Sequence, residues 1–486
     1  MSTDWRTGRL TMCGSLTILA LALRAPTFVT RLFDADEAAI GVQAMVVRSG
    51  GKLYTDIYDR KPPLPPLLYA ASFSLTDSTD VRLMRVLVSL LLAASGILVA
   101  LECLRRWGPR HAWWGGVLLI AGAMALFPTD AGAANYAHFA LLPGTAAIIW
   151  ARRATLPTAI AAGVAIGVAI LCRQSWLLGV VPGCISVGLH GRWRNVPPFL
   201  AAAAATVATT GFYAPLARFW EWYVTNSPGF VFAGTSIWSA LGKGLASVAG
   251  FGAFHPVIAI ATGIAAAAGV AAIRRRTVPG DVDLWVWVAS GIAAWAAGLR
   301  FFGHYWLQVV PPLVLLSVPV VVEWTRRARR AAMVAVTVPA ITTWVLLFVP
   351  GSFHNRPDPA VLASYVSSHT TAADRVFVWG SYPEVLVVAG RLPAGALVHT
   401  DFVVGRSGGR NDPAKTLPSA VPGARDIMLK SLAEHPPLLI LDTSTAPGLG
   451  YRNYPISLLP DLDQFIHDGY QQVGTVDGVT ISRRRQ

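Results

Sequence analysis

Long apolar runs are the feature of this sequence that most limits how it can fold. A helix needs about 20 apolar residues to cross a bilayer, and fewer where flanking side chains reach back to the interface. Only 14% of the residues are charged, whereas soluble domains carry about 25%, and the mean hydropathy is +0.50. The sequence therefore predicts an α-helical polytopic membrane protein with about eleven spans. The predicted spans lie near residues 11–30, 81–103, 112–128, 137–151, 157–172, 175–189, 196–214, 246–272, 283–299, 305–322 and 331–349.

The basic residues predict how these helices are oriented. The chain has 40 Lys and Arg against 26 Asp and Glu, a net charge of +14. In membrane proteins such an excess marks cytoplasmic loops, so we do not expect nucleic-acid binding. With the N-terminus inside, an odd number of spans places everything after residue 350 outside. The cytoplasmic clusters are then Arg6 and Arg9; Arg105, Arg106 and Arg110; Arg152 and Arg153; Arg192 and Arg194; 274–276; and 326–330.

The chain changes character after the last predicted span, which divides it into a membrane part, 1–350, and a C-terminal part, 351–486. Alternating strand and helix patterns predict that the second part is a small extracytoplasmic α/β domain with a mostly parallel sheet. Composition predicts a mobile loop at 404–418. The predicted strands are 375–380 and 438–442, and the predicted helices start at Asp358-Pro359 and lie near 382–390, 419–434 and 459–469.

The first outer loop, about residues 30–80, holds three acids within four positions, Asp34, Asp36 and Glu37. Carboxylates beside a bilayer serve as a general base or as metal ligands. Mutual repulsion is expected to raise the pKa of at least one of them, which suits a base. The following residues predict a short helix lying on the outer interface. The simpler alternative is that the acids only cap this helix, although three exceed what a cap needs.

Three basic residues near this loop are suited to bind a phosphate. Lys61 precedes two prolines, which hold it in an extended segment as a fixed positive charge; an ordinary proline-rich turn is the alternative. Arg82 and Arg85 lie at the outer mouth of the second predicted span, where an unpaired arginine is costly. They are expected either to bind a phosphate or to pair with neighbouring aspartates.

Further polar residues occur at the outer ends of later spans. Asp130 ends the third span and is expected to be a second carboxylate of the site, or else a helix cap. Arg300, His304 and Tyr305 precede the tenth span. This combination suits a lipid phosphate and a stacked sugar, while an ordinary aromatic belt is the alternative.

Together these motifs resemble glycosyltransferase family 39, over roughly residues 30–350. The family consists of GT-C enzymes and includes protein O-mannosyltransferases and lipid A aminoarabinose transferases. The C-terminal part is similar to α/β domains that some members append. The matching motifs are Asp36-Glu37, the turn Gly50-Gly51-Lys52-Leu53-Tyr54-Thr55-Asp56, Lys61-Pro62-Pro63-Leu64, Arg85, and His304-Tyr305 before Pro311-Pro312.

The resemblance implies a reaction in the plasma (inner) membrane. A sugar leaves a polyprenyl-phosphate carrier, with inversion, for a hydroxyl of an extracytoplasmic acceptor. Asp36 matches the catalytic general base, and Glu37 is expected to orient it or the sugar. Lys61 and Arg85 are expected to hold the departing phosphate. Some relatives bind a divalent metal such as Mg or Mn near the acids, which Asp34 and Asp130 would permit.

One departure narrows the substrate. The aminoarabinose enzymes have Glu directly before Lys-Pro-Pro, whereas this chain has Arg60. This argues against aminoarabinose as the sugar and leaves the acceptor open. The sequence shows no long lumenal repeats of the protein O-mannosyltransferase kind, so a protein acceptor is not favoured and we expect a cell-envelope glycan or lipid. The alternatives are a transporter or flippase for polyprenyl-linked lipids, and an inactive family member that serves as a binding protein. A transporter is less favoured because the acids gather at one rim instead of along a path through the bilayer.

Overall fold

The structure is a computed structural model that describes residues 3–153, 155–226, 236–275, 281–349, 357–407 and 410–485. Three parts of the predictions lie outside these residues: Arg276, residues 227–235 of the predicted outer segment between the spans 196–214 and 246–272, and 408–409 in the expected loop. Contacts between residues divide the chain into two compact units. The helical unit comprises Met1–Thr30, Arg82–Ala208 and Ile237–Pro350, and the mixed unit comprises Arg31–Val81, Thr209–Ser236 and Gly351–Gln486.

This division shares the boundary after Pro350 with the predicted one, but it follows contacts instead of chain order. The first outer loop and 209–236 belong to the same compact unit as the C-terminal part. The division into a membrane part and an outer domain remains a prediction.

Each predicted span contains at least one helix of the helical unit. The helices are α1 (Thr3–Arg24), α4 (Arg82–Trp107), α5 (Pro109–Met124), α6 (Pro128–Gly132), α7 (Tyr136–Ala151), α8 (Leu156–Cys172), α9 (Val180–His190), α10 (Val196–Ala208), α13 (Ile237–Phe254), α14 (Pro256–Arg274), α15 (Val282–Ala296), α16 (Val310–Glu323) and α17 (Arg326–Leu346). Short 3₁₀ helices include η1 (Ala25–Phe28), η2 (Gln174–Gly179) and η6 (Gly303–Gln308).

Three described segments are long and apolar enough to cross a membrane by themselves: Gly8–Phe28, Arg82–Trp107 and Pro256–Arg274. Four shorter helices, α7, α8, α15 and α16, are also apolar. The number of spans, about eleven, therefore remains a prediction. One expected span, 246–272, is wrong as a single helix, because Pro256 lacks an N–H and displaces His255 from helical geometry, which separates α13 from α14.

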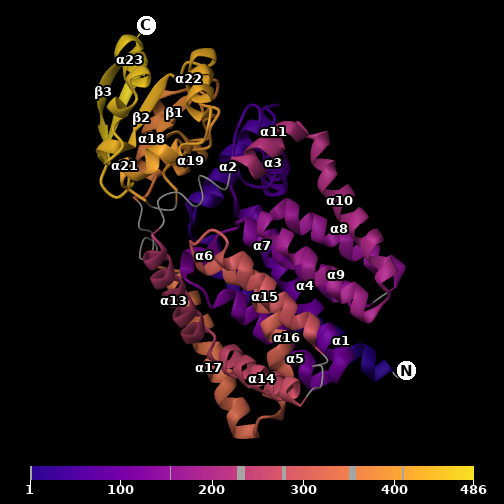
Figure 1. Ribbon diagram of the computed structural model, residues 1–486. Coiled ribbons are helices and arrows are strands. Elements are labelled where there is room, and N and C mark those ends of the chain that lie inside the picture. Colours follow the sequence, from indigo (N-terminus) through magenta and orange to yellow (C-terminus); the bar gives the residue numbers. More distant parts are fainter. Residues whose placement is uncertain are drawn as a thin grey trace. The chain divides into compact units, whose positions relative to one another are not determined.

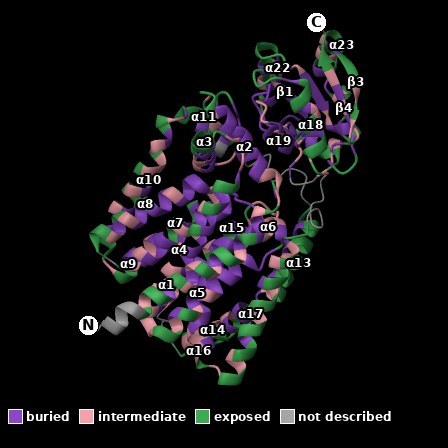
Figure 2. Ribbon diagram, turned by 180° about the vertical axis from the view of Figure 1, so that it is seen from behind, coloured by how far each residue is buried: buried purple, intermediate pink, exposed green. Residues whose placement is uncertain are grey.

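Small residues let the helices of this unit approach closely. A Cβ at Gly96 of α4 would lie 2.6 Å from the Ile120 side chain of α5, and one at Gly163 of α8 would lie 2.2 Å from the Phe199 carbonyl of α10. Close packing of this kind is typical of membrane helices. Buried residues predominate in α5 and α7, whereas most residues of α10 and α13 are exposed or intermediate (Figure 2).

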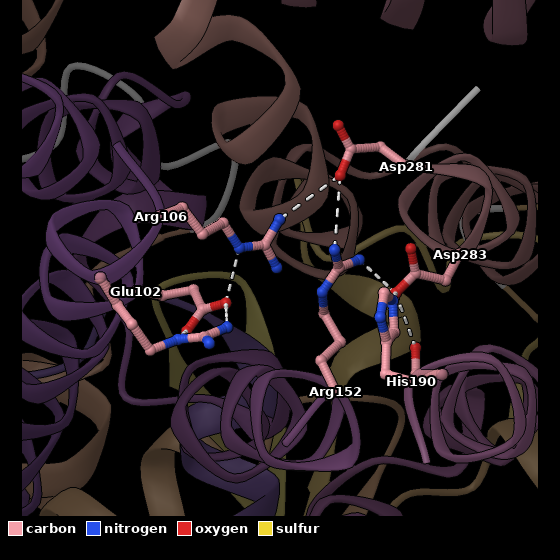
Figure 3. A network of polar contacts seen from close by, with 8 residues as sticks. Glu102, Arg106, Arg152, His190, Asp281 and Asp283 are labelled. Carbon is pink, nitrogen blue, oxygen red and sulfur yellow. Dashed lines mark hydrogen bonds and ion pairs between the residues drawn. The ribbon is translucent and has the colours of Figure 1, made fainter. Parts of the chain in front are cut away.

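An ionic network joins four helix ends within the helical unit (Figure 3). Arg106 at the end of α4 pairs with Glu102 at 2.6 Å, and Arg152 after α7 pairs with Asp281 at 3.4 Å. Arg152 also pairs with Asp283 of α15, which His190 of α9 approaches to 3.1 Å. The predicted alternation of spans places these ends on one side. The identity of that side as cytoplasmic remains a prediction.

The mixed unit contains a four-stranded sheet flanked by helices (Figure 1). Its strand order is β1-β2-β4-β3. The elements of the C-terminal part are α18 (Ala360–His369), β1 (Val376–Trp379), α19 (Glu384–Ala389), α20 (Asp401–Val404), α21 (Pro413–Thr416), α22 (Ala424–Glu434), β2 (Leu439–Asp442), α23 (Pro460–Gly469), β3 (Tyr470–Val476) and β4 (Val479–Arg484). The two predicted strands and the predicted helices are thereby confirmed.

The expectation of a mostly parallel sheet is wrong. Only the β1–β2 pair is parallel, and β4 pairs antiparallel with both β2 and β3. The missed strands form a hairpin around Asp477-Gly478, both with positive φ, 50° and 80°. Asp-Gly is the preferred pair for such a turn.

The first outer loop folds onto the C-terminal part within the mixed unit. It contains α2 (Ala35–Arg48) and α3 (Leu64–Thr76). The Tyr58 N–H donates to the Ala396 carbonyl at 2.7 Å, and the Val398 N–H donates to the Tyr58 carbonyl at 3.3 Å. The predicted helix after Asp36 is confirmed as α2, but its expected interfacial position is not, because every residue from 37 to 46 is buried.

Candidate active site

The three acids of the first loop have different partners. Asp34 caps α2, since its Oδ1 accepts a hydrogen bond of 2.6 Å from the Glu37 N–H. Glu37 is fully buried, and its Oε2 accepts from the Phe33 N–H at 2.9 Å. Capping therefore accounts for the placement of Asp34 and Glu37. It does not account for Asp36.

Asp36 forms an ion pair with Lys61, so two residues predicted for the site meet in the structure. The Asp36 side chain is 39% exposed and that of Lys61 16% exposed. Lys61 is positioned through its backbone, because its carbonyl accepts from the Tyr54 hydroxyl at 2.6 Å. Nearby, buried Asp59 accepts from the Gln43 side chain of α2 at 3.1 Å, which ties this segment to the helix. The pair thus combines an accessible carboxylate with a fixed ammonium group.

Burial raises the pKa of Asp34 well above its usual value, and the charges of Asp36 and Glu37 raise it further. The sequence predicts a raised pKa in this cluster, and the structure assigns it to the capping residue. Burial and the neighbouring charges thus favour the protonated form of Asp34.

A second pair of predicted residues meets in the helical unit. Asp130 of α6 lies 2.5 Å from Nδ1 of His304 in η6. Tyr305 stacks under the guanidinium of Arg173, which lies 4.2 Å from the ring centre. Sequence reasoning missed Arg173. Its signal was an arginine between two closely spaced apolar stretches, 157–172 and 175–189.

Two buried arginines of the helical unit are held by backbone carbonyls. Fully buried Arg85 donates from Nη1 to the Thr27 carbonyl at 2.5 Å and also to that of Thr30. Arg24, likewise buried, donates to the carbonyl groups of Ala131 and Gly132, next to Asp130. These contacts fix the ends of helices. Arg82 is exposed, and a phosphate-binding role of Arg82 or Arg85 remains a prediction.

A cavity of about 370 Å³ lies within the helical unit. Asp130 and Arg300 line it, and so does Lys243 of α13, which sequence reasoning missed. The remaining walls are mainly apolar and aromatic: Ala125, Leu126, Phe127, Ala246, Ser247, Gly250, Phe251, Phe254, His255, Phe301, Gly303 and Trp306. An apolar chamber with two cations suits an amphiphilic anion.

A buried polar pair at the start of α7 also escaped sequence reasoning. The Nδ1–H of His138 donates to Asn135 Oδ1 at 3.0 Å. The His138 Nε2 and Asn135 Nδ2 atoms are buried and lack a hydrogen-bond partner among the described residues. Buried atoms of this kind commonly bind ordered water. The signal for this pair was a His three residues after an Asn that caps a helix.

The acids do not form a preassembled metal site. Asp34 and Glu37 accept backbone hydrogen bonds, and Asp36 and Asp130 have basic partners. No group of three or more His, Cys, Asp or Glu placed to hold a metal occurs in the part of the chain that the structure describes. A divalent metal near these acids therefore remains a prediction.

No protein-family model matches the sequence, and no curated protein matches it. Solved structures do. ArnT from Cupriavidus metallidurans bound to undecaprenyl phosphate matches 99% of this chain and 98% of its own, with 13% identity and a TM-score of 0.61. Archaeal oligosaccharyltransferase AglB from Archaeoglobus fulgidus, in complex with an inhibitory peptide and a dolichol-phosphate, matches 100% of this chain and 75% of its own, with 12% identity and a TM-score of 0.56.

The Archaeoglobus fulgidus oligosaccharyltransferase has also been solved in complex with Zn and sulfate. That structure matches 89% of this chain and 68% of its own, with 11% identity and a TM-score of 0.53. These neighbours are glycosyltransferases of the GT-C superfamily, and this chain has their fold, as the resemblance to glycosyltransferase family 39 predicts.

Proposed function

We propose that this protein is a membrane glycosyltransferase that moves a sugar from a polyprenyl-phosphate carrier to an extracytoplasmic acceptor. The observation that carries the proposal is the Asp36–Lys61 ion pair in a chain with the GT-C fold. ArnT was solved with undecaprenyl phosphate and AglB with a dolichol-phosphate, and we infer a carrier of the same class here.

The chemistry assigns one task to each member of the pair. The acceptor hydroxyl oxygen bonds to the anomeric carbon while the bond from that carbon to the phosphate oxygen breaks. The Asp36 carboxylate takes the hydroxyl proton as a general base. The Lys61 ammonium neutralises charge that develops on the departing phosphate. Attack opposite the leaving group inverts the anomeric configuration.

The cavity of the helical unit supports the same carrier class. Its aromatic and aliphatic walls suit isoprene units, and Arg300 and Lys243 suit a phosphate. We propose that His304 and Tyr305, joined to Asp130 and Arg173, hold polar groups of the substrate. Glu37 and Asp34 then act on the site by fixing the start of α2.

The cellular setting is part of the proposal. We infer a multi-pass protein of the plasma membrane with about eleven spans and its N-terminus in the cytoplasm. The first loop and residues 351–486 then face outward. We propose a cell-envelope glycan or lipid as the acceptor, and a sugar other than aminoarabinose, because Arg60 stands where the aminoarabinose enzymes have Glu.

The test uses the purified full-length protein with a radiolabelled polyprenyl-phosphate monosaccharide and an envelope extract as acceptor. We expect release of polyprenyl phosphate, and loss of that release with Asp36→Ala while lipid binding persists. A protein that moves the intact lipid across proteoliposome membranes, with or without Asp36, and never releases polyprenyl phosphate would be a transporter instead.

A further inference from the structure

A histidine of the C-terminal part lies beside the first loop, within the mixed unit. A parallel β-bridge pairs Tyr58 with Leu397. Two hydrogen bonds stabilise this bridge: the Tyr58 N–H donates to the Ala396 carbonyl at 2.7 Å, and the Val398 N–H donates to the Tyr58 carbonyl at 3.3 Å. Both segments leave the parallel bridge in the same direction. His399 therefore comes next to the segment that ends at Lys61.

The charges around His399 agree with this placement. Asp401 from its own segment and Asp59, Lys61 and Arg60 from the first loop all act on its ring. Burial is the largest influence and lowers the pKa of His399, so the imidazole is neutral near pH 7. A neutral ring offers one hydrogen-bond donor and one acceptor.

The ring also has unused hydrogen-bonding capacity. Its Nδ1 is buried without a hydrogen-bond partner among the described residues and lies 3.6 Å from an Asp401 oxygen. The ring stacks on Phe402, 4.6 Å between centres, and the side chain is still 19% exposed. A buried unpaired polar atom is unfavourable unless function requires it. With Nδ1 directed toward Asp401, Nε2 is the nitrogen that remains for a ligand.

We propose that His399 is a sugar-binding residue of the site around Asp36 and Lys61, and that it hydrogen-bonds a hydroxyl of the sugar on the polyprenyl-phosphate donor. This rests on the proposed function. Asp401 positions the ring, because its other oxygen is fixed by the Tyr451 hydroxyl at 2.8 Å and by Arg406 at 3.3 Å. The C-terminal part thereby contributes to recognition of the sugar.

The test compares two probes on the purified full-length protein: undecaprenyl phosphate, and the same lipid carrying glucose, mannose or arabinose. For a sugar that the wild type binds more tightly than the bare lipid, His399→Ala should weaken binding about tenfold, as expected for one lost hydrogen bond. Binding of the bare lipid should stay within about twofold. His399→Gln, which retains a polar group near the Nε2 position, should recover most of the affinity.

Lys61→Gln should weaken binding of both probes, and His467→Ala, an exposed histidine of the same part, should weaken neither. Equal effects of His399→Ala on both probes would show a merely structural role and overturn the inference. So would a wild type with no preference for any sugar-bearing probe. A wild type that binds none of the lipids would contradict the proposed function itself.

Discussion

Asp34, Asp36 and Glu37 show why a residue's type and position do not define its role. All three are acids within four positions, yet two accept backbone hydrogen bonds and one pairs with Lys61. The cap could be expected from sequence, since Asp at the N-cap with Glu three residues later is a helix start signal. The sequence alone does not show which of the three acids pairs with Lys61, because Asp36 and Lys61 are 25 positions apart in the chain.

Asp34→Asn should make stability less sensitive to pH. The folded-state pKa of Asp34 is raised, so folding favours its protonated form, and stability is lost as pH rises from the unfolded pKa through the folded one. Asn keeps the cap without ionising. We expect equal melting temperatures for variant and wild type at about pH 3, below the unfolded pKa, and a higher one for the variant at neutral pH. A variant that melts lower at neutral pH would contradict this assignment.

Arg85→Gln should separate a structural role from phosphate binding. The guanidinium is buried against two carbonyls, so its loss should cost about 3 kcal/mol of stability. Thermal unfolding in detergent measures this, and Arg82→Gln is the control because Arg82 is exposed. A purely structural role predicts an unchanged affinity of the folded protein for undecaprenyl phosphate. A weakened affinity at unchanged melting temperature would support phosphate binding instead.

At the scale of elements, apolar periodicity predicted most helices and the first two strands of the sheet, β1 and β2. It missed β3, β4 and α3. The β3–β4 hairpin carries many polar residues, and its Asp477-Gly478 turn was the available signal. α3 begins directly after Pro63, within the first outer loop, which was analysed for its charged residues and not for helical periodicity. The pairing of the first loop with 396–398 had no sequence signal, because long-range contacts depend on tertiary packing.

The packing of α2 against α19 should depend on Gly41. A Cβ at this position would lie 2.9 Å from Val387, so Gly41→Leu should overpack the contact and cost about 1–3 kcal/mol. Adding Val387→Ala should restore part of the melting temperature, and Gly14→Leu is the control because no atom lies within 4 Å of its Cβ. If the losses of melting temperature caused by Gly41→Leu and Val387→Ala simply add in the double variant, the two residues are not in contact.

At the scale of the whole molecule, the first loop and the C-terminal part form one compact unit although some 270 residues separate them along the chain. Chain order led us to assign the loop to the membrane part. The apolar runs predicted the helical fold, and the comparison with ArnT and AglB confirms the GT-C fold. The cavity with Lys243 could not be predicted, because its lining comes from segments far apart in sequence.

Removal of residues 357–486 should therefore destabilise the first loop. α2 would lose its packing against α19, where Gly41 approaches Val387, and Tyr58 would lose both hydrogen bonds to 396–398. Limited proteolysis should then cut within 31–81, where the full-length protein resists. A truncated protein with equal protection of this segment would show that the loop folds independently of the C-terminal part.

The claim on which the whole account depends is that Asp36 is the base of a glycosyl transfer. The most direct measurement is the single-turnover rate of polyprenyl phosphate release by Asp36→Asn and by Asp56→Asn, an exposed acid of the same loop that accepts from the Lys52 N–H. We predict a loss of about 10²–10⁴ for the first at unchanged donor affinity, and less than about threefold for the second. Equal rates for Asp36→Asn and the wild type would contradict the account.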